Sequence, residues 1–170
     1  MTTTGRRTVV RSRMLPIATS AAGLLVGCAS LPPAPSGPAA TPVVEFFRKP
    51  DSRLPFSPAV RVGDVVYLSG QIGATADGRI PEGLEAQARA AMDNLVASAK
   101  LAGVTMADVF KCLVMLDDMS QWAAFNQVYV TYFDPARLPA RSAFGVDGLA
   151  LGATLEVECM AVAPPAHAAR

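Results

Sequence analysis

Two charged side chains in the last third of the chain could together carry out hydrolysis of a small carboxylate substrate. Arg141 is a planar, two-pronged donor that matches the geometry of a carboxylate. Glu156 can orient or deprotonate a water molecule. Held in one cleft, the pair would bind an acid and direct water at the electrophilic carbon beside it. Each residue also has an ordinary structural interpretation: Arg141 as a strand-end cation paired with Asp147 or Glu158, and Glu156 as a solvated acid.

The stretch around these two residues alternates apolar and polar side chains, which is typical of β-structure. Residues 141–147 and 153–163 are predicted to form the two arms of one hairpin. In the second arm one face carries Leu155, Val157, Cys159 and Ala161, and the other carries Thr154, Glu156, Glu158 and Met160. If the arms pair symmetrically about Ala150, Arg141 and Glu156 point to opposite faces, so a site that uses both needs a second subunit. A shift of one residue in register would reverse this inference.

Composition narrows the chemistry that these residues can support. The 170-residue chain is 51% hydrophobic and 17% charged, enough for one packed domain plus a short extra segment. Its one histidine, His167, lies in an Ala/Pro-rich tail, which argues against catalysis by a histidine base or a histidine-bound metal. Cys28, Cys112 and Cys159 have neither zinc-like spacing nor an obvious disulfide framework, and the last two are interpreted as small hydrophobic strand residues. We expect no metal and no cofactor.

The first 27 residues are predicted to be a signal peptide. A basic start with four arginines and no acid precedes the uncharged run 14–27, which is too short to span a bilayer as a helix. The run ends in Leu25-Val26-Gly27-Cys28, which resembles the lipobox of bacterial lipoproteins, so Cys28 is the expected site of lipid attachment. This signal predicts a lipoprotein of the cell envelope that faces the periplasm. An ordinary secretory signal, giving a secreted protein, and a misplaced start codon are the alternatives.

The segment 28–42 consists mainly of Pro, Ala, Ser and Gly and is predicted to be an extended tether, and 164–170 a disordered tail. Without residues 1–27 the chain keeps 11 of its 15 basic residues against 14 acidic ones, a net charge of −3. Binding to phosphate backbones needs a concentrated basic surface, so nucleic acid is not an expected partner. The membrane contact that we expect is the lipid anchor alone.

The globular domain is predicted to span residues 43–163. Strands are expected at 60–62 and 65–72, a helix at 82–102, a central strand at 109–116, and a second helix that begins at Ser120 as its N-cap. An inner stripe on this second helix contains Trp122, Phe125, Val128, Tyr129 and Tyr132. With the C-terminal hairpin the order is ββαβαββ, which favours an α+β fold with one sheet and two helices on one of its faces.

The opposite face of that sheet is predicted to be too apolar for water. It would carry Val65, Tyr67, Leu113 and Met115. Exposed apolar faces of this kind are normally covered by another copy of the chain or by a partner. An oligomer is therefore expected.

Four motifs in order give the chain a family resemblance. They are Leu54-Pro55-Phe56-Ser57, the strand 65–72, Asp118-Met119 with Phe125-Asn126-Gln127-Val128-Tyr129, and Pro139-Ala140-Arg141-Ser142 followed by Leu155-Glu156-Val157-Glu158. Together they resemble the Rid family of reactive-imine deaminases, also known as YjgF-like or "L-PSP endoribonuclease" proteins. The resemblance covers residues 50–163. It implies a chorismate-mutase-like subunit with one mixed sheet, and a homotrimer with three clefts between its subunits.

The resemblance also implies an activity: hydrolysis of enamines and imines such as 2-aminoacrylate and 2-iminobutanoate to 2-keto acids and ammonia, without metal or cofactor. Arg141 would hold the substrate carboxylate and Glu156 the attacking water, with Ser69, Phe56 and Ala143 lining the cleft. Phe56 stands where many such deaminases have Tyr, and Ala143 where some have Cys, so substrate preference is expected to differ.

Two other functions remain open at this stage. The same cleft could serve a non-catalytic binding module of the cell envelope that holds a carboxylate ligand through Arg141. The ribonuclease activity of the family's older name is disfavoured by the acidic mature charge and the absence of a basic patch. Asn126, which the resemblance places on the second helix, is interpreted as a structural hydrogen-bonding residue.

Overall fold

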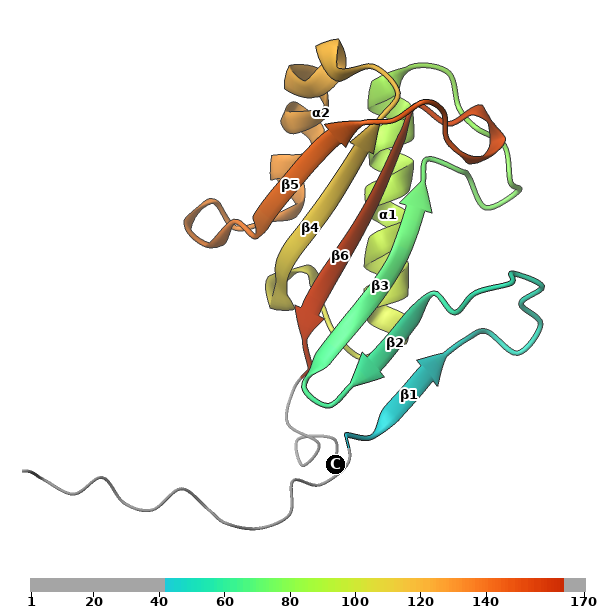
Figure 1. Ribbon diagram of the computed structural model, residues 1–170, viewed down its shortest axis with the longest axis vertical. Coiled ribbons are helices and arrows are strands. Elements are labelled where there is room, and N and C mark those ends of the chain that lie inside the picture. Colours follow the sequence, from blue (N-terminus) through green and yellow to red (C-terminus); the bar gives the residue numbers. More distant parts are fainter. Residues whose placement is uncertain (1–41, 164–170) are drawn as a thin grey trace, which may run out of the picture. The chain divides into compact units, whose positions relative to one another are not determined.

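Periodic and alternating apolar patterns produce six strands and two α-helices in residues 42–163, the part of the chain that the computed structural model describes (Figure 1). The strands are β1 (Val44–Phe47), β2 (Ala59–Val62), β3 (Val65–Ile72), β4 (Val109–Leu116), β5 (Ala140–Gly145) and β6 (Leu155–Val162), and the helices are α1 (Leu84–Leu101) and α2 (Trp122–Tyr129). The predicted signal peptide, Cys28, most of the tether and the tail lie outside the described residues. Within the described residues no helix is long and apolar enough to cross a membrane.

All six strands form one sheet in the order β1-β2-β3-β6-β4-β5. The pair β4 and β5 is parallel, and the other neighbours are antiparallel, so the sheet is mixed as expected. The predicted order ββαβαββ is preceded by one further strand, β1, that the sequence did not indicate. β1 has only four residues at the sheet edge, three of them exposed, and therefore shows no alternation of buried and exposed positions.

The prediction of one hairpin from residues 141–147 and 153–163 is wrong. β5 pairs with β4, and β6 lies between β3 and β4, so the two predicted arms are not neighbours (Figure 1). The connection passes the end of β4, where Val146 N donates to Leu116 O (2.9 Å) and Asp117 N donates to Thr154 O (3.0 Å). Alternation defines which face each side chain occupies, but it does not identify the partner strand.

Both helices pack on the same face of the sheet and bury the core there (Figure 1). The largest fully buried side chains come from both layers: Val66, Met92, Leu95, Cys112, Val114, Leu116, Phe125, Leu155 and Val157. In β6 the buried residues alternate with half-exposed ones, as the sequence predicted. The other face of the sheet is partly open, and Tyr67 and Phe144 there are 45% and 44% exposed.

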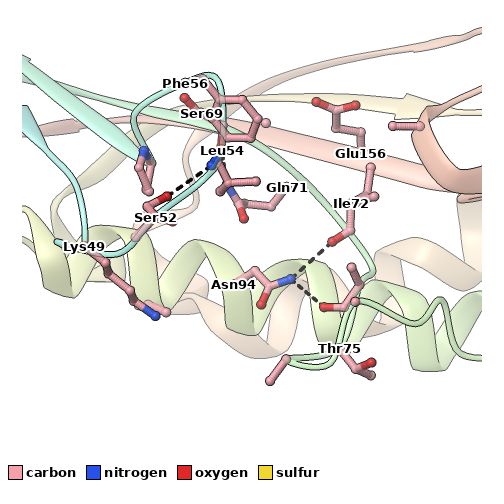
Figure 2. A pocket seen from close by; sticks show the side chains of 18 of the residues that line it. Lys49, Ser52, Leu54, Phe56, Ser69, Gln71, Ile72, Thr75, Asn94 and Glu156 are labelled. Atoms are coloured by element: carbon pink, nitrogen blue, oxygen red, sulfur yellow. Dashed lines mark hydrogen bonds between the residues drawn. The ribbon is translucent and has the colours of Figure 1, made fainter.

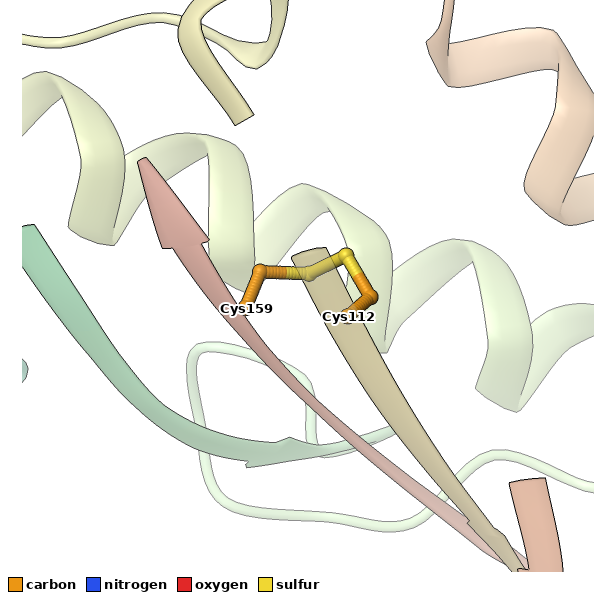
Figure 3. The surroundings of a disulfide bond; sticks show 2 residues. All are labelled: Cys112 and Cys159. Atoms are coloured by element: carbon orange, nitrogen blue, oxygen red, sulfur yellow. A yellow bond between two sulfur atoms is a disulfide. The ribbon is translucent and has the colours of Figure 1, made fainter. Parts of the chain in front are cut away.

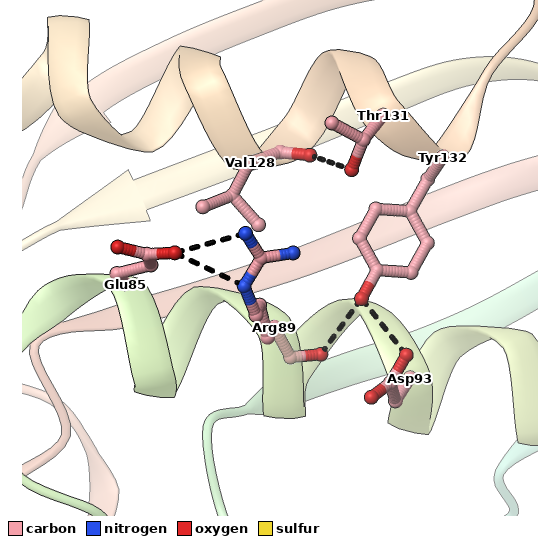
Figure 4. A network of polar contacts seen from close by, with 6 residues as sticks. All are labelled: Glu85, Arg89, Asp93, Val128, Thr131 and Tyr132. Carbon is pink, nitrogen blue, oxygen red and sulfur yellow. Dashed lines mark hydrogen bonds and ion pairs between the residues drawn. The ribbon is translucent and has the colours of Figure 1, made fainter.

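A hydrogen bond also joins the 3₁₀ turn Val130–Tyr132, which follows α2, to α1 (Figure 4). The Tyr132 hydroxyl donates to Asp93 Oδ1 at 2.8 Å. Within α1, Arg89 forms an ion pair with Glu85, one turn away, at 2.8 Å. Burial and the neighbouring Asp93 carboxylate raise the pKa of Tyr132 to about 12. Tyr132 therefore keeps its proton at neutral pH and remains a donor that fixes the distance between the two helical segments.

The prediction that Ser120 caps the second helix is wrong. A short 3₁₀ turn, Met119–Gln121, precedes α2, and Asp118 is its cap: the Asp118 carboxylate accepts a hydrogen bond from Ser120 N at 2.8 Å. Hydrogen bonds from the Ser120 hydroxyl and backbone lower the pKa of Asp118. The carboxylate of Asp118, the residue directly before the turn, thus accepts one of the free N–H groups at the start of this helical segment.

The interpretation of Cys112 and Cys159 as separate hydrophobic residues is also wrong, because the two form a disulfide (Figure 3). They face each other directly across the antiparallel pair β4 and β6, with Cα atoms 4.1 Å apart, and both are buried. Their separation of 47 residues gives no hint of this contact, which depends on the register between two strands that are distant in sequence. The disulfide covalently links β4 and β6, two neighbouring interior strands of the sheet.

Candidate functional site

A hollow of about 790 Å³ opens beside the C-terminal half of β3 and contains three of the predicted site residues (Figure 2). Phe56 comes from the loop between β1 and β2, Ser69 from β3, and Glu156 from β6. Further walls are contributed by α1 and by the 3₁₀ turn Ala150–Gly152. The sheet register explains the meeting of β3 and β6 residues, since Ile72 pairs directly with Glu156.

Glu156 projects from the sheet face opposite the helices and lies against the backbone of Gly70. A Cβ atom at position 70 would collide with Glu156 Oε1 and come within 2.9 Å of Glu156 Cδ. Gly70 sits where the register between β3 and β6 shifts, between Leu68 and Gln71. The absence of a side chain at this bulge makes room for the carboxylate.

The surroundings of Glu156 favour the protonated acid more than water does. Burial raises the pKa of Glu156, and the negative charge of Glu158, two residues along the same face, raises it further. A carboxylate with a raised pKa is a stronger base toward water than an ordinary exposed glutamate. The site therefore contains a half-buried carboxyl group with a raised pKa beside a concave surface, a combination that suits a general base.

Ser69 lines the hollow and also fixes its rim. Its hydroxyl donates to Ser57 O at 2.7 Å, and its backbone N donates to Pro58 O at 3.0 Å. These two bonds hold the loop that carries Phe56 against β3. The oxygen of Ser69 keeps lone pairs that can accept a hydrogen bond from a ligand.

Asn94, a residue that the sequence did not single out, fixes the opposite wall (Figure 2). Its side-chain amide donates to Ala74 O at 2.8 Å and to Ile72 O at 3.3 Å, and so holds the end of β3 against α1. A half-buried asparagine on the apolar stripe of α1 was the signal in the sequence that could have indicated such a role.

Arg141 lies apart from this hollow, on the helix side of β5. Its guanidinium carbon lies 4.4 Å from the ring centres of both Trp122 and Tyr129, and Nη2 donates to Asn126 Oδ1 at 2.7 Å. Neither Asp147 nor Glu158 pairs with it in the described structure. The structural role expected for Asn126 is confirmed: it positions Arg141.

Arg141 is a partly buried cation with a donor group that the described residues do not satisfy. Desolvation by burial lowers the pKa of Arg141, and Nη1 is buried with no hydrogen-bond partner among the described residues. Burial also raises the pKa of Tyr129 to about 12, so the ring that stacks on Arg141 is neutral. The aromatic stripe on α2 was interpreted from the sequence only as core, because stacking on Arg141 requires the position of β5.

The predicted site residues therefore fall into two groups. Arg141 is level with inward-facing Cys112, and Ala143 with inward-facing Val114, whereas Glu156 faces outward beside Met115. The expectation that Arg141 and Glu156 point to opposite faces is confirmed, although the pairing used to derive it was not correct. One chain gathers Phe56, Ser69 and Glu156; it does not bring Arg141 or Ala143 to them.

Fold and site together define a class: α+β subunits with a chorismate-mutase-like mixed sheet and an acid at the end of a central strand. Comparison with known proteins identifies the family within this class. The family model described as Endoribonuclease L-PSP matches residues 47–163. The chain belongs to this family, also known as the Rid or YjgF-like family.

Relatives and solved structures agree with that assignment. A mouse protein named 2-iminobutanoate/2-iminopropanoate deaminase is 36% identical over 125 residues, which are 72% of this chain and 92% of the mouse protein. An Escherichia coli protein named putative reactive intermediate deaminase TdcF is 34% identical over 123 residues, 71% and 95% of the two chains. The crystal structure of the E. coli YjgF gene product superposes with a TM-score of 0.64 at 30% identity, covering 69% of this chain and 98% of that one.

Proposed function

We propose that this protein hydrolyses reactive enamines and imines of the 2-aminoacrylate and 2-iminobutanoate type to 2-keto acids and ammonia. The observation that carries the proposal is the position of Glu156, half-buried beside a hollow with its carboxylate against Gly70 and its pKa raised. The names of relatives at about 35% identity point to the same reaction.

The reaction at Glu156 balances without any further reagent. Water adds to the carbon of the C=NH₂⁺ group while one of its protons passes to the Glu156 carboxylate, which gives a carbinolamine. Glu156 then returns the proton to the amino nitrogen. The C–N bond breaks as the hydroxyl oxygen forms the C=O bond, and ammonia leaves with the hydroxyl proton as ammonium. The net change is one protonated imine (C=NH₂⁺) and one water converted to one keto acid and one ammonium ion.

Arg141 is proposed to hold the substrate carboxylate at a site shared by two subunits. Nη2 donates to Asn126, whereas Nη1 is buried, has no hydrogen-bond partner within residues 42–163 and is available to an anion. Since Arg141 and Glu156 project from opposite faces of one sheet, each cleft of the proposed homotrimer would combine Arg141 of one subunit with the hollow of its neighbour. The partly open, apolar sheet face supports such an assembly.

The purified full chain, mixed with 2-iminobutanoate formed in situ by threonine dehydratase, tests the proposed activity. Keto-acid release is followed in competition with trapping of the imine by semicarbazide. We expect acceleration by the wild type that is lost in Glu156→Gln and in Arg141→Ala, and kept in the control Glu45→Gln, which removes an exposed carboxylate from β1. No acceleration by the wild type, with carboxylate binding that is lost in Arg141→Ala and kept in Glu156→Gln, would identify a carboxylate-binding module instead.

We also propose that the protein is exported to the cell envelope and anchored through a lipid on Cys28. The disulfide between Cys112 and Cys159 supports this address, because such bonds persist in oxidising compartments and are rare in the cytoplasm of mesophiles. Mass spectrometry of the protein from its native membrane would show a diacylated residue 28, and Cys28→Ser would release the protein from the membrane fraction. An unmodified N-terminus in the cytoplasm would contradict the proposal.

A further inference from the structure

We infer that the hollow at Glu156 prefers 2-imino acids with a bulky apolar side chain over the smallest members of the class. This inference rests on the proposed function and names its substrate more closely. The hollow measures about 790 Å³, within the range of about 300–1,000 Å³ that accommodates drug-sized ligands. A three- or four-carbon imino acid would leave much of that volume to water.

Large apolar side chains gather around this hollow although they are far from buried. Leu54, Phe56 and Leu151 line it and are 47%, 43% and 73% exposed. Ile72 and Leu101 add apolar surface to the same walls. Exposed apolar side chains that converge on a concave surface next to a catalytic acid provide a place where the apolar part of a ligand can leave water.

Charged groups are scarce on the same walls. Among the described lining residues only Lys49 and Glu156 are charged. Phe56 offers a ring without a hydroxyl. The polar lining side chains Ser69, Gln71, Thr75 and Asn94 already donate hydrogen bonds to backbone carbonyls of the same chain. A polar substrate side chain would therefore find few partners here, whereas an apolar one loses nothing by entering.

Leu151 is held at the hollow by an unusual backbone conformation. Its φ of 58° lies in the left-handed region, which a leucine rarely adopts, and Gly152 follows with φ 70°. The turn is anchored on α1, because the buried Gln87 accepts hydrogen bonds from Thr154 N at 2.9 Å and Thr154 Oγ1 at 3.1 Å. Side chains kept in such conformations are concentrated at ligand-binding sites.

A series of imines made in situ from amino acids tests the inference on the full chain. An amino-acid oxidase converts alanine, leucine and phenylalanine to their imines, with O₂ reduced to H₂O₂ that catalase removes, and hydrolysis is followed against semicarbazide trapping. We expect kcat/KM for the leucine and phenylalanine imines to exceed that for the alanine imine by about tenfold or more. Equal values, or a preference for the alanine imine, overturn this inference and leave the proposed function intact. No acceleration of any imine overturns both.

The variant Leu151→Asn separates specificity from folding. Asparagine is close to leucine in size and tolerates the left-handed conformation, so the turn should persist while the apolar surface is lost. We expect kcat/KM for the leucine imine to fall by about tenfold and that for the alanine imine to stay within about twofold. The control Leu138→Asn changes a residue that is 52% exposed and away from the hollow, and should not alter the ratio. An equal loss on both imines for Leu151→Asn overturns the role of this side chain.

Discussion

Breaking the disulfide between Cys112 and Cys159 should destabilise the domain by an amount that follows from the number of residues between the two cysteines. The bond closes a loop of 47 residues between the neighbouring interior strands β4 and β6. Without this cross-link the unfolded chain regains conformational entropy, which lowers the free energy of unfolding by about 4 kcal/mol. For a domain near 120 residues, 4 kcal/mol corresponds to a fall of about 15 °C in Tm.

Differential scanning calorimetry of Cys112→Ala, Cys159→Ala and the double variant measures this loss. Either single substitution removes the bond, so each should lower Tm nearly as much as the double variant does. All variants should carry Cys28→Ser, so that thiol titration counts only the two buried cysteines, and should be compared at one protein concentration. Reductant should lower the Tm of the wild type, slowly because both sulfur atoms are buried, and should leave the double variant unchanged.

Two results would refute this reasoning. Losses from the single substitutions that add up in the double variant would mean that the cysteines act as separate core residues. Two free thiols in denatured, unreduced Cys28→Ser protein that keeps both Cys112 and Cys159 would mean that the bond does not form.

Three further predictions concern the site itself. Gly70→Ala should lower kcat by about 10- to 100-fold without abolishing folding, since the new methyl group displaces the Glu156 carboxylate; steady-state kinetics and circular dichroism check both parts. Trp122→Ala should raise KM more than it lowers kcat, because Arg141 loses one of its two stacking rings, and binding of a keto-acid product measured by calorimetry should weaken in parallel. The rate should fall as pH drops through the raised pKa of Glu156, above the usual value of 4.5, and Glu158→Gln should shift that limb of the pH profile to lower pH.

The same raised pKa has a consequence for stability. A carboxyl group whose pKa is higher in the folded than in the unfolded state binds protons more tightly when folded, so it stabilises the fold at low pH and loses that contribution as pH rises. At neutral pH the ionised Glu156 carboxylate therefore slightly destabilises the folded state. The inactive variant Glu156→Gln should be at least as stable as the wild type.

The sequence predicted the positions of helices and strands, and the faces of their side chains, better than it predicted which strands pair. The 3.6-residue period located α1, and the alternation in β6 placed Glu156 on the face opposite the core. Both signals are local, because they arise from burial of one side of a single element. Strand pairing is not local, so β6 was assigned to β5 although it lies between β3 and β4.

Other features were not predicted for the same reason: they depend on how distant segments pair and pack. The disulfide needs the register of β4 against β6, and the rings around Arg141 need the position of β5 beside α2. Leu151 falls between the two predicted hairpin arms, and its place at the hollow depends on a backbone conformation that no local pattern encodes.

The most direct test of the shared site combines two inactive variants. Arg141→Ala and Glu156→Gln chains, carrying different affinity tags, are co-expressed, and trimers that contain both are purified and assayed on 2-iminobutanoate. If each cleft takes Arg141 from one subunit and Glu156 from the next, every purified mixed trimer has one cleft in three with both residues intact, so about a third of the wild-type activity is restored. Mixed trimers as inactive as either parent, with an active wild type, would contradict the shared cleft.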